Sequence, residues 1–122
     1  MEKTDIAYIA GLFDGEGTVG FYRRYEKKKD RKGIPRKSLC YRISVEIAMT
    51  ERSILLWLQQ TLHMGTVSKK PRKEHKTQWR WRCSFRNAYV FCCLIHPYCH
   101  VKMEKVNQVI NFEDYKKAMN LE

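Results

Sequence analysis

The sequence predicts an α+β domain whose elements follow the order α-β-β-α-β-β-α. The spacing of apolar residues switches repeatedly between the helical period and the period of two that is typical of half-buried strands. Glycine and proline residues separate several of these segments. Four antiparallel strands would bury one face under the helices and leave the other in solvent. We therefore expect a saddle-like, four-stranded antiparallel sheet with the helices on one face.

The first part of the chain predicts a helix, two strands and a second helix. Apolar residues recur at helical spacing over about residues 4–13. From Thr18 the period changes to two, and a second alternating stretch covers about residues 38–48, so both are predicted strands. A helix over about residues 51–63 follows, with Thr50 as its N-cap.

The second part predicts two more strands and two more helices. The strands are expected over residues 66–70 and about 77–85, with a turn between them. The helices are expected over about residues 87–95 and 101–112, with a break at Pro97 between them.

Length and composition fit one small domain of 122 residues, 43% of them hydrophobic. We expect this domain to span residues 1–122, with a core over about 4–110 and a C-terminal tail helix over 111–122. No apolar run reaches the roughly 18 residues that a membrane span needs. Glu2 and Asp5 stand where a secretory signal would carry its basic and apolar regions. A soluble, intracellular protein is expected.

The net charge of +11 is concentrated in two stretches. Residues 22–37 hold nine Lys or Arg against two acids, and residues 68–86 hold eight against one. Both stretches are interleaved with aromatic and β-branched residues, which favours strands on a shared charged surface over a solvated tail. A polyanion is the natural partner. A membrane surface is less favoured, because neither stretch predicts an amphipathic helix with a basic face.

Strand alternation places a set of basic and polar side chains on the solvent face of the predicted sheet. A curved surface of this kind is shaped to lie along a DNA groove, and we predict that the set contacts DNA. The parity of the fourth strand stays open, because Trp79 and Trp81 could exchange faces with the arginines. The set consists of Tyr22, Arg24, Arg42, Ser44, Ser68, Lys70, Arg80 and Arg82.

A short motif lies where the first helix gives way to the first strand. It reads Ile9-Ala10-Gly11-Leu12-Phe13-Asp14-Gly15-Glu16-Gly17. This string closely resembles the motif that names the LAGLIDADG homing endonuclease family. The predicted element order also matches the core of that family, so the resemblance covers about residues 4–110. It implies an enzyme that hydrolyses phosphodiester bonds in both strands of double-stranded DNA.

The resemblance assigns the acidic residues of the motif different roles. Phosphodiester hydrolysis needs an activated water and neutralisation of negative charge, which divalent cations held by carboxylates supply. Glu16 matches the metal-binding acid of the family, and the backbone carbonyl of Gly15 is by resemblance a second ligand. Asp14 matches an acid that is largely structural. Mg²⁺ is the expected cofactor, with Mn²⁺ as an alternative, Ca²⁺ as a non-catalytic substitute, and no small-molecule cofactor.

A single copy of the motif resembles the homodimeric branch of the family. Cutting two strands needs two active sites, and in that branch the motif helices of two subunits pack against each other. Ala7, Gly11 and Gly15 form a stripe of small residues that would let another backbone approach closely. A symmetric dimer implies a long, nearly palindromic target.

Two further residues are candidates for catalysis. The segment from His96 to Lys102 resembles the Pro-Tyr stretch before the last core helix of the family, and Lys102 falls on the position of its active-site lysine. A solvated lysine is the alternative. The family also has a polar residue after the second strand that holds a metal-bound water. Glu46 is our choice for that role, although the alignment slips here and a surface glutamate is equally consistent.

Two other functions stay open at this point. One is a non-catalytic DNA- or RNA-binding module on the same scaffold, such as a maturase or a regulator. The other is an RNA-binding zinc protein, although five cysteines without a secretory signal are more typical of reduced, buried thiols. The residues that would bind the zinc are Cys92, Cys93, His96, Cys99 and His100.

Overall fold

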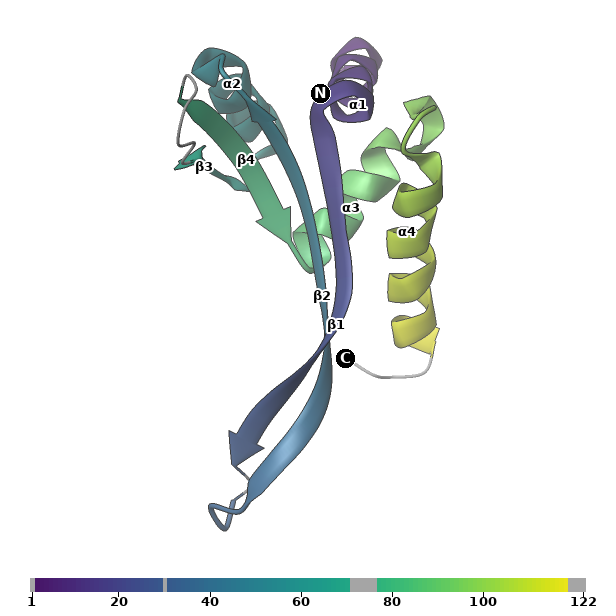
Figure 1. Ribbon diagram of the computed structural model, residues 1–122. Helices are drawn as coiled ribbons and strands as arrows, with labels where there is room; N and C mark the ends of the chain where they lie inside the picture. Colours follow the sequence, from purple (N-terminus) through teal and green to yellow (C-terminus); the bar gives the residue numbers. More distant parts are fainter. Residues whose placement is uncertain (1, 30, 71–76, 119–122) are drawn as a thin grey trace.

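The structure is a computed structural model that describes residues 2–29, 31–70 and 77–118, without the side chains of residues 22–28, 36–41 and 113–118. The predicted order of helices and strands is confirmed (Figure 1). The elements are α1 (Lys3–Glu16), β1 (Gly17–Lys29), β2 (Pro35–Met49), α2 (Arg52–Leu62), β3 (Thr66–Lys70), β4 (Gln78–Ser84), α3 (Arg86–Ile95), the 3-10 turn η1 (His96–Tyr98) and α4 (Met103–Ala118).

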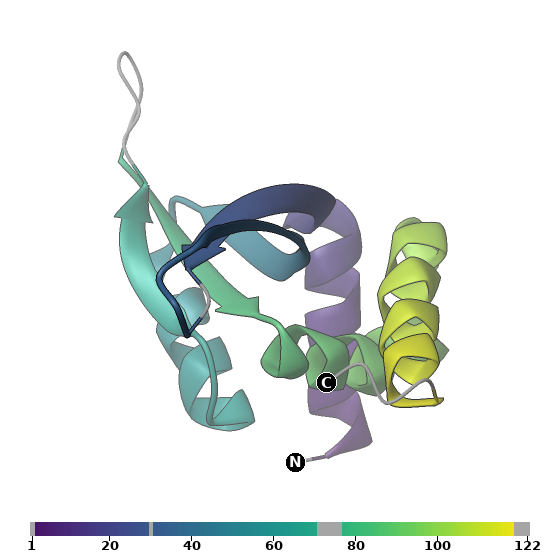
Figure 2. The ribbon, with the colours of Figure 1, turned by 90° about the horizontal axis from the view of Figure 1, so that it is seen from below.

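The strands form one antiparallel sheet in the order β1-β2-β4-β3. One row across this sheet joins Thr18, Glu46, Arg82 and Thr66, each directly opposite the next. The hairpin of β1 and β2 is much longer than β4, so it continues alone beyond the end of that strand (Figure 1). The helices lie on one side of the curved sheet, as predicted, and leave the other side open (Figure 2).

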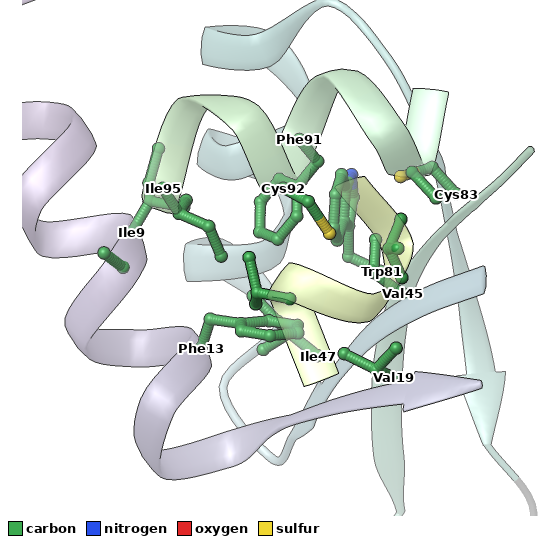
Figure 3. Packing of buried hydrophobic residues seen from close by; sticks show 14 of the residues in the cluster. Ile9, Phe13, Val19, Val45, Ile47, Trp81, Cys83, Phe91, Cys92 and Ile95 are labelled. Atoms are coloured by element: carbon green, nitrogen blue, oxygen red, sulfur yellow. The ribbon is translucent and has the colours of Figure 1, made fainter. Parts of the chain in front are cut away.

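The core lies between this sheet and the helices, because one face of each central strand is apolar. Val45 and Ile47 of β2 and Trp81 of β4 are fully buried. Around Trp81 the core is aromatic: its ring centroid lies 5.0 Å from that of Phe91 in α3, which lies 5.2 Å from that of Phe13 in α1 (Figure 3). Trp81 therefore points inward, which settles the parity of β4 and sends its arginines to the open face.

The connection from α2 to β3 is shaped by the same tryptophan. The last turn of α2 is closed by His63 in the left-handed region, at φ 54°. Gly65 then has φ +87°, and a Cβ atom built on it would lie 2.3 Å from Trp81 Nε1. The Trp81 indole N–H donates a hydrogen bond to the carbonyl oxygen of Met64 at 3.0 Å. Glycine is needed here both for its backbone conformation and for the close approach of the indole.

Two predicted helix boundaries are wrong. α2 begins at Arg52 with Glu51, and not Thr50, at the N-cap. Over residues 111–118 the predicted separate tail helix is instead the end of α4, which runs without a break to Ala118, and residues 119–122 lie outside the described part of the chain. No glycine or proline interrupts residues 113–118, so nothing in the sequence stops the helix after Phe112. The Phe112 ring itself packs edge-on against Phe21 of β1 with 5.1 Å between centroids, which anchors α4 to the sheet. Within the described part of the chain, no helix has the length and apolar character of a membrane span.

Candidate functional site

The motif lies where α1 ends and β1 begins, and Gly17 fixes that junction. The Gly17 N–H donates to the carbonyl oxygen of Phe13 and closes the helix. A Cβ atom on Gly17 would lie 2.3 Å from Cδ1 of Phe13 and 2.5 Å from its carbonyl oxygen. Since Phe13 is fully buried and cannot withdraw, only glycine fits at this position. Glu16 is consequently held at the point where the chain leaves the helix for the sheet.

Asp14 ties this junction to a segment at the other end of the chain. Its Oδ2 accepts a hydrogen bond from the His100 N–H at 2.8 Å. Its Oδ1 accepts from the N–H groups of Val101 and Lys102, both at 3.1 Å. Three main-chain donors that precede α4 thus converge on one carboxylate. This carboxylate connects two parts of the chain, which is the structural role expected for Asp14.

These hydrogen bonds shift the ionisation of Asp14. Partial burial by itself raises the pKa of this carboxyl group. The three backbone N–H groups and the side chain of Cys99 donate to the charged form and outweigh that effect, so the pKa of Asp14 lies below its ordinary value of 3.8. The carboxylate is therefore ionised at neutral pH and stabilised in the folded state.

The end of α1 leaves carbonyl oxygens without helical partners, and their contacts differ. The Phe13 carbonyl accepts the hydrogen bond from Gly17, as noted above. The Asp14 carbonyl accepts one from Nζ of Lys102 at 3.3 Å. No described residue donates a hydrogen bond to the carbonyl of Gly15, and this glycine is exposed. One main-chain oxygen therefore remains available beside Glu16.

The donor set at this helix end suits a magnesium ion. The Glu16 side chain is exposed, and it makes no hydrogen bond or ion pair with any other residue that the structure describes. A carboxylate and a carbonyl oxygen are ligands that Mg²⁺ prefers, and Mg²⁺ commonly takes only one or two carboxylates, with water and phosphate oxygens as its other ligands. Over the described ranges, no group of three or more His, Cys, Asp or Glu residues could hold a metal ion by itself. The residues present fit an open magnesium site in which water and phosphate oxygens complete the ligands of the ion.

A hollow of about 350 Å³ opens beside this junction, between the start of β1 and the start of α4. Gly17 and Thr18 form one wall, and Lys102 and Lys105 contribute to the other. Val101 also lines the hollow and is 76% exposed. Glu104 is the one acid among the residues that line the hollow, against the two lysines. The hollow thus adjoins the helix end that carries Glu16, and its lysines could contact a phosphate group there.

The open face of the sheet carries the basic side chains that the sequence places there. Arg42, Ser44, Arg80 and Arg82 alternate with buried residues of β2 and β4. On β3, Ser68 lies directly opposite Arg80, and Lys70 reaches Glu46 on the same face. The side chains of Tyr22 and Arg24 lie outside the described residues, but their main chain belongs to β1, opposite Arg42 and Cys40.

Glu46 is enclosed by two of these basic residues. Its Oε2 lies 3.2 Å from Nζ of Lys70, and its Oε1 lies 3.7 Å from a guanidinium nitrogen of Arg80. The Nε–H of Arg80 also donates to Oγ of Ser68 at 3.3 Å. We call these four residues the Glu46 network. The pattern of the sequence gives no signal for it, because it depends on the order and register of three strands.

Comparison with protein families identifies the chain. The family model described as LAGLIDADG endonuclease matches residues 9–119, which include the motif, the sheet and Lys102. The chain belongs to the LAGLIDADG endonuclease family. A comparison with curated proteins finds no match.

Solved structures share the LAGLIDADG fold with this chain. In I-CvuI bound to the I-CreI target, the likeness has a TM-score of 0.66 at 18% identity and covers 89% of this chain and 65% of that one. The meganuclease I-CpaMI bound to uncleaved DNA has a TM-score of 0.67 at 15% identity, and the likeness covers 94% of this chain and 37% of that one. I-SmaMI bound to uncleavable DNA has a TM-score of 0.70 at 13% identity, and the likeness covers 98% of this chain and 39% of that one. The chain thus spans less than two thirds of these longer proteins.

The small residues of the LAGLIDADG helix face solvent in the single subunit. Ala7, Gly11 and Gly15 are all exposed. A Cβ atom built on Gly11 or Gly15 would meet no other atom within 4 Å. Nothing within the subunit requires glycine at these two positions, although each glycine costs a helix about 1 kcal/mol relative to alanine. No contact within the described subunit therefore compensates for the helix stability that these two glycines cost.

Most of the cysteines whose side chains the structure describes in this LAGLIDADG protein are core residues. Cys83, Cys92 and Cys99 are buried, whereas Cys93 is exposed. Burial raises the pKa of the Cys92 thiol to about 12 and that of Cys99 to about 11. Nε2 of His96 lies 2.8 Å from Oδ1 of Asn107. These contacts give the zinc interpretation of the 92–100 segment no support.

The hydrogen bonds that the Asp14 carboxylate accepts from residues 100–102 predict a specific pH dependence of stability. The folded pKa is depressed, so the contribution of Asp14 is complete above the unfolded value of 3.8 and is lost as the pH falls through the folded pKa. Asp14→Asn places an amide N–H₂ among N–H donors, and we expect it to lower the free energy of unfolding by about 1–3 kcal/mol at pH 7. Urea denaturation at pH 7 and at lower pH values measures this difference.

Asp5→Asn is the matched control on the same helix, because no described residue donates a hydrogen bond to the Asp5 carboxylate. We expect the gap between wild type and Asp14→Asn to narrow as the pH falls below about 4. A gap that stays constant down to the lowest pH at which the protein folds would show that the Asp14 charge contributes nothing to stability.

Proposed function

We propose that this protein is a homing endonuclease that hydrolyses phosphodiester bonds in both strands of a long, nearly palindromic DNA site. The observation that carries the proposal is the exposed Glu16 carboxylate at the LAGLIDADG helix end, next to an available carbonyl of Gly15, on the same helix end whose Asp14 carbonyl accepts from Lys102. Family membership and the DNA-bound state of I-CvuI, I-CpaMI and I-SmaMI support it.

In this proposal Glu16 and the carbonyl of Gly15 hold a divalent cation, Mg²⁺ or Mn²⁺. Such a cation would neutralise charge on the phosphate and lower the pKa of a bound water. Structures of I-CvuI with DNA are described in the presence of Mg and of Ca. The Mg structure is the one whose DNA is described as not cleaved. Ca²⁺, which also takes oxygen ligands, is our choice for measuring DNA binding apart from cleavage.

Lys102 supplies a positive charge beside the same helix end. Its Nζ lies 3.3 Å from the Asp14 carbonyl, and its main-chain N–H is held by the Asp14 carboxylate. Both contacts hold Lys102 against Asp14, two residues before Glu16, and the first places its ammonium group at the end of α1 before any substrate binds. A cation that is already in place stabilises negative charge that develops on a phosphate without reorganisation at the moment of reaction.

Two subunits are needed, because one chain presents one Glu16 and the cut requires two. We propose that α1 packs against α1 of a second copy through Ala7, Gly11 and Gly15. The open space around both glycines supports this arrangement, since it lets two backbones approach closely. A two-fold dimer of this kind would align two charged sheet faces along one duplex.

The open face is the proposed DNA surface. Its described cations on β2, β3 and β4 are Arg42, Lys70, Arg80 and Arg82, against the single acid Glu46 on the same face. Cations that replace condensed counterions on DNA give binding that weakens as salt rises. Tyr22, Arg24, Ser44 and Ser68 complete the proposed set.

Glu16→Gln is expected to reduce cleavage by roughly a hundredfold or more while DNA binding persists, because the amide loses the charge that holds the cation. Cleaved sites are first selected from a randomised duplex library with Mg²⁺. Cleavage of the selected duplex and its binding in Ca²⁺ are then measured. Glu51→Gln, at an exposed acid beside α2, is the control. Wild-type protein that binds duplex DNA but never cuts it would instead indicate a non-catalytic binding module.

Gly11→Leu is expected to yield a monomer that folds normally. The new side chain projects into open space in the subunit but would separate two packed helices. Sedimentation velocity reports the mass, and circular dichroism reports the fold. Gln108→Leu, at an exposed position of α4, is the matched control. A dimeric Gly11→Leu protein would rule out the α1 interface.

Glu46 has two candidate roles that one variant separates. The ion pairs with Lys70 and Arg80 support a positioning role, in which Glu46 orients these cations and partly neutralises them. We then expect Glu46→Gln to bind DNA about threefold more tightly, with a steeper salt dependence. Binding titrations in Ca²⁺ at several salt concentrations measure both. Unchanged affinity with lost cleavage would favour the catalytic role predicted from the sequence.

A further inference from the structure

Phe85 breaks the alternation of the sheet directly after β4. Its N–H donates to the carbonyl oxygen of Ile43 at 2.9 Å, so the pairing with β2 continues one residue past Ser84. In this register position 85 follows Trp81 and Cys83, which point into the core. Phe85 is nevertheless 48% exposed. A large apolar ring is thus turned away from the core that it would otherwise enter.

The backbone of Phe85 produces this turn, and phenylalanine is a poor residue for it. Its φ is 55° and its ψ is −124°. Bulky L-residues rarely adopt a positive φ, whereas glycine does so without strain. Neither the conformation nor burial accounts for a phenylalanine here. Strained residues that persist in this way are characteristic of functional positions.

The exposed ring is held at the rim of the open face by Arg42. The guanidinium carbon of Arg42 lies 5.5 Å from the centroid of the Phe85 ring, which is within cation–π distance. Arg42 alternates with the buried Ile43, so it belongs to the open face. The pair lies where β4 ends and the longer hairpin of β1 and β2 continues alone (Figure 1).

The chemistry of this pair narrows what it can contact on a duplex. Base faces are stacked inside double-stranded DNA, so an aromatic ring on a sheet cannot stack on them without opening the helix. The major groove admits a β-ribbon, and the apolar group that it displays is the C5 methyl of thymine, which phenylalanine can contact. A positively charged neighbour favours the approach to DNA and orients the ring.

We propose that Phe85, oriented by Arg42, is a specificity residue that recognises a thymine methyl group in the target. The proposal rests on the proposed function only in requiring duplex DNA against the open face; it does not require cleavage. In a symmetric dimer the contact would occur once in each half of the site. Phe85 would then touch the substrate, and Arg42 would act as a positioning residue for it.

A binding selection tests this proposal without relying on catalysis. Wild type, Phe85→Ala and Val90→Ala each select duplexes from a randomised library in Ca²⁺. Val90 is the matched control, because it is also an exposed apolar residue but lies on α3. We expect Phe85→Ala to lose a thymine preference at one position in each half-site and to keep the rest of the pattern. Val90→Ala should select the wild-type pattern.

Deoxyuridine in place of that thymine isolates the methyl group. Wild-type binding should weaken about fourfold for each methyl removed, and Phe85→Ala should be insensitive to the change. Equal selected patterns for wild type and Phe85→Ala, or equal sensitivity of both to deoxyuridine, would overturn the proposal. A wild type that selects no duplex at all would contradict the proposed function itself.

Phe85→Gly separates recognition from folding. Glycine accepts the positive φ, so the thermal unfolding temperature should stay level or rise, although the thymine preference is lost. Arg42→Gln should weaken the same preference in part, because the ring loses its cation. A Phe85→Gly protein that unfolds at a lower temperature would show that the ring serves the fold, and that result would count against the proposal.

Discussion

One carboxylate holds the candidate active site together. Asp14 collects three main-chain N–H groups from residues 100–102 and returns its own carbonyl to the ammonium of Lys102. Glu16 and Lys102 lie far apart in the chain, and this clasp of hydrogen bonds joins the two segments that carry them. Because the partners are main-chain groups next to the first turn of α4, the clasp also sets where that helix starts. Everything proposed for the catalytic centre depends on this long-range contact.

Much of the fold follows from local patterns. The switch between helical and strand periods predicts all four strands, and β3 has the bounds expected for it. Alternation also predicts the open face, although it leaves the parity of β4 undecided. Packing supplies the missing information there: the indole of Trp81 fits against Gly65 and Phe91, which no period can reveal. The contact between Phe112 of α4 and Phe21 of β1 is equally invisible to a period, because it joins residues far apart in the chain.

The candidate site is predictable only where residue type and chain position suffice. Glu16, Gly15 and Lys102 follow from the motif and its resemblance, and the hydrogen bonds of Asp14 agree with a structural role. The Glu46 network could not be foreseen, because Lys70 and Glu46 lie on strands that are separated by β4. The exposure and backbone conformation of Phe85 could not be predicted either, since its sequence context indicates only the end of a strand. Register and backbone conformation, rather than composition, decide both cases.

The use of main-chain donors by the clasp has an evolutionary consequence. The side chains of His100 and Val101 are exposed, and neither is needed for the hydrogen bonds that their N–H groups make. The side chains at these two positions can therefore change in charge and size while the hydrogen bonds to the Asp14 carboxylate are kept. Val101 lines the hollow beside the end of α1, so this wall can vary without loss of the clasp, and an engineer could attach a fluorescent label at position 101 to report on the hollow.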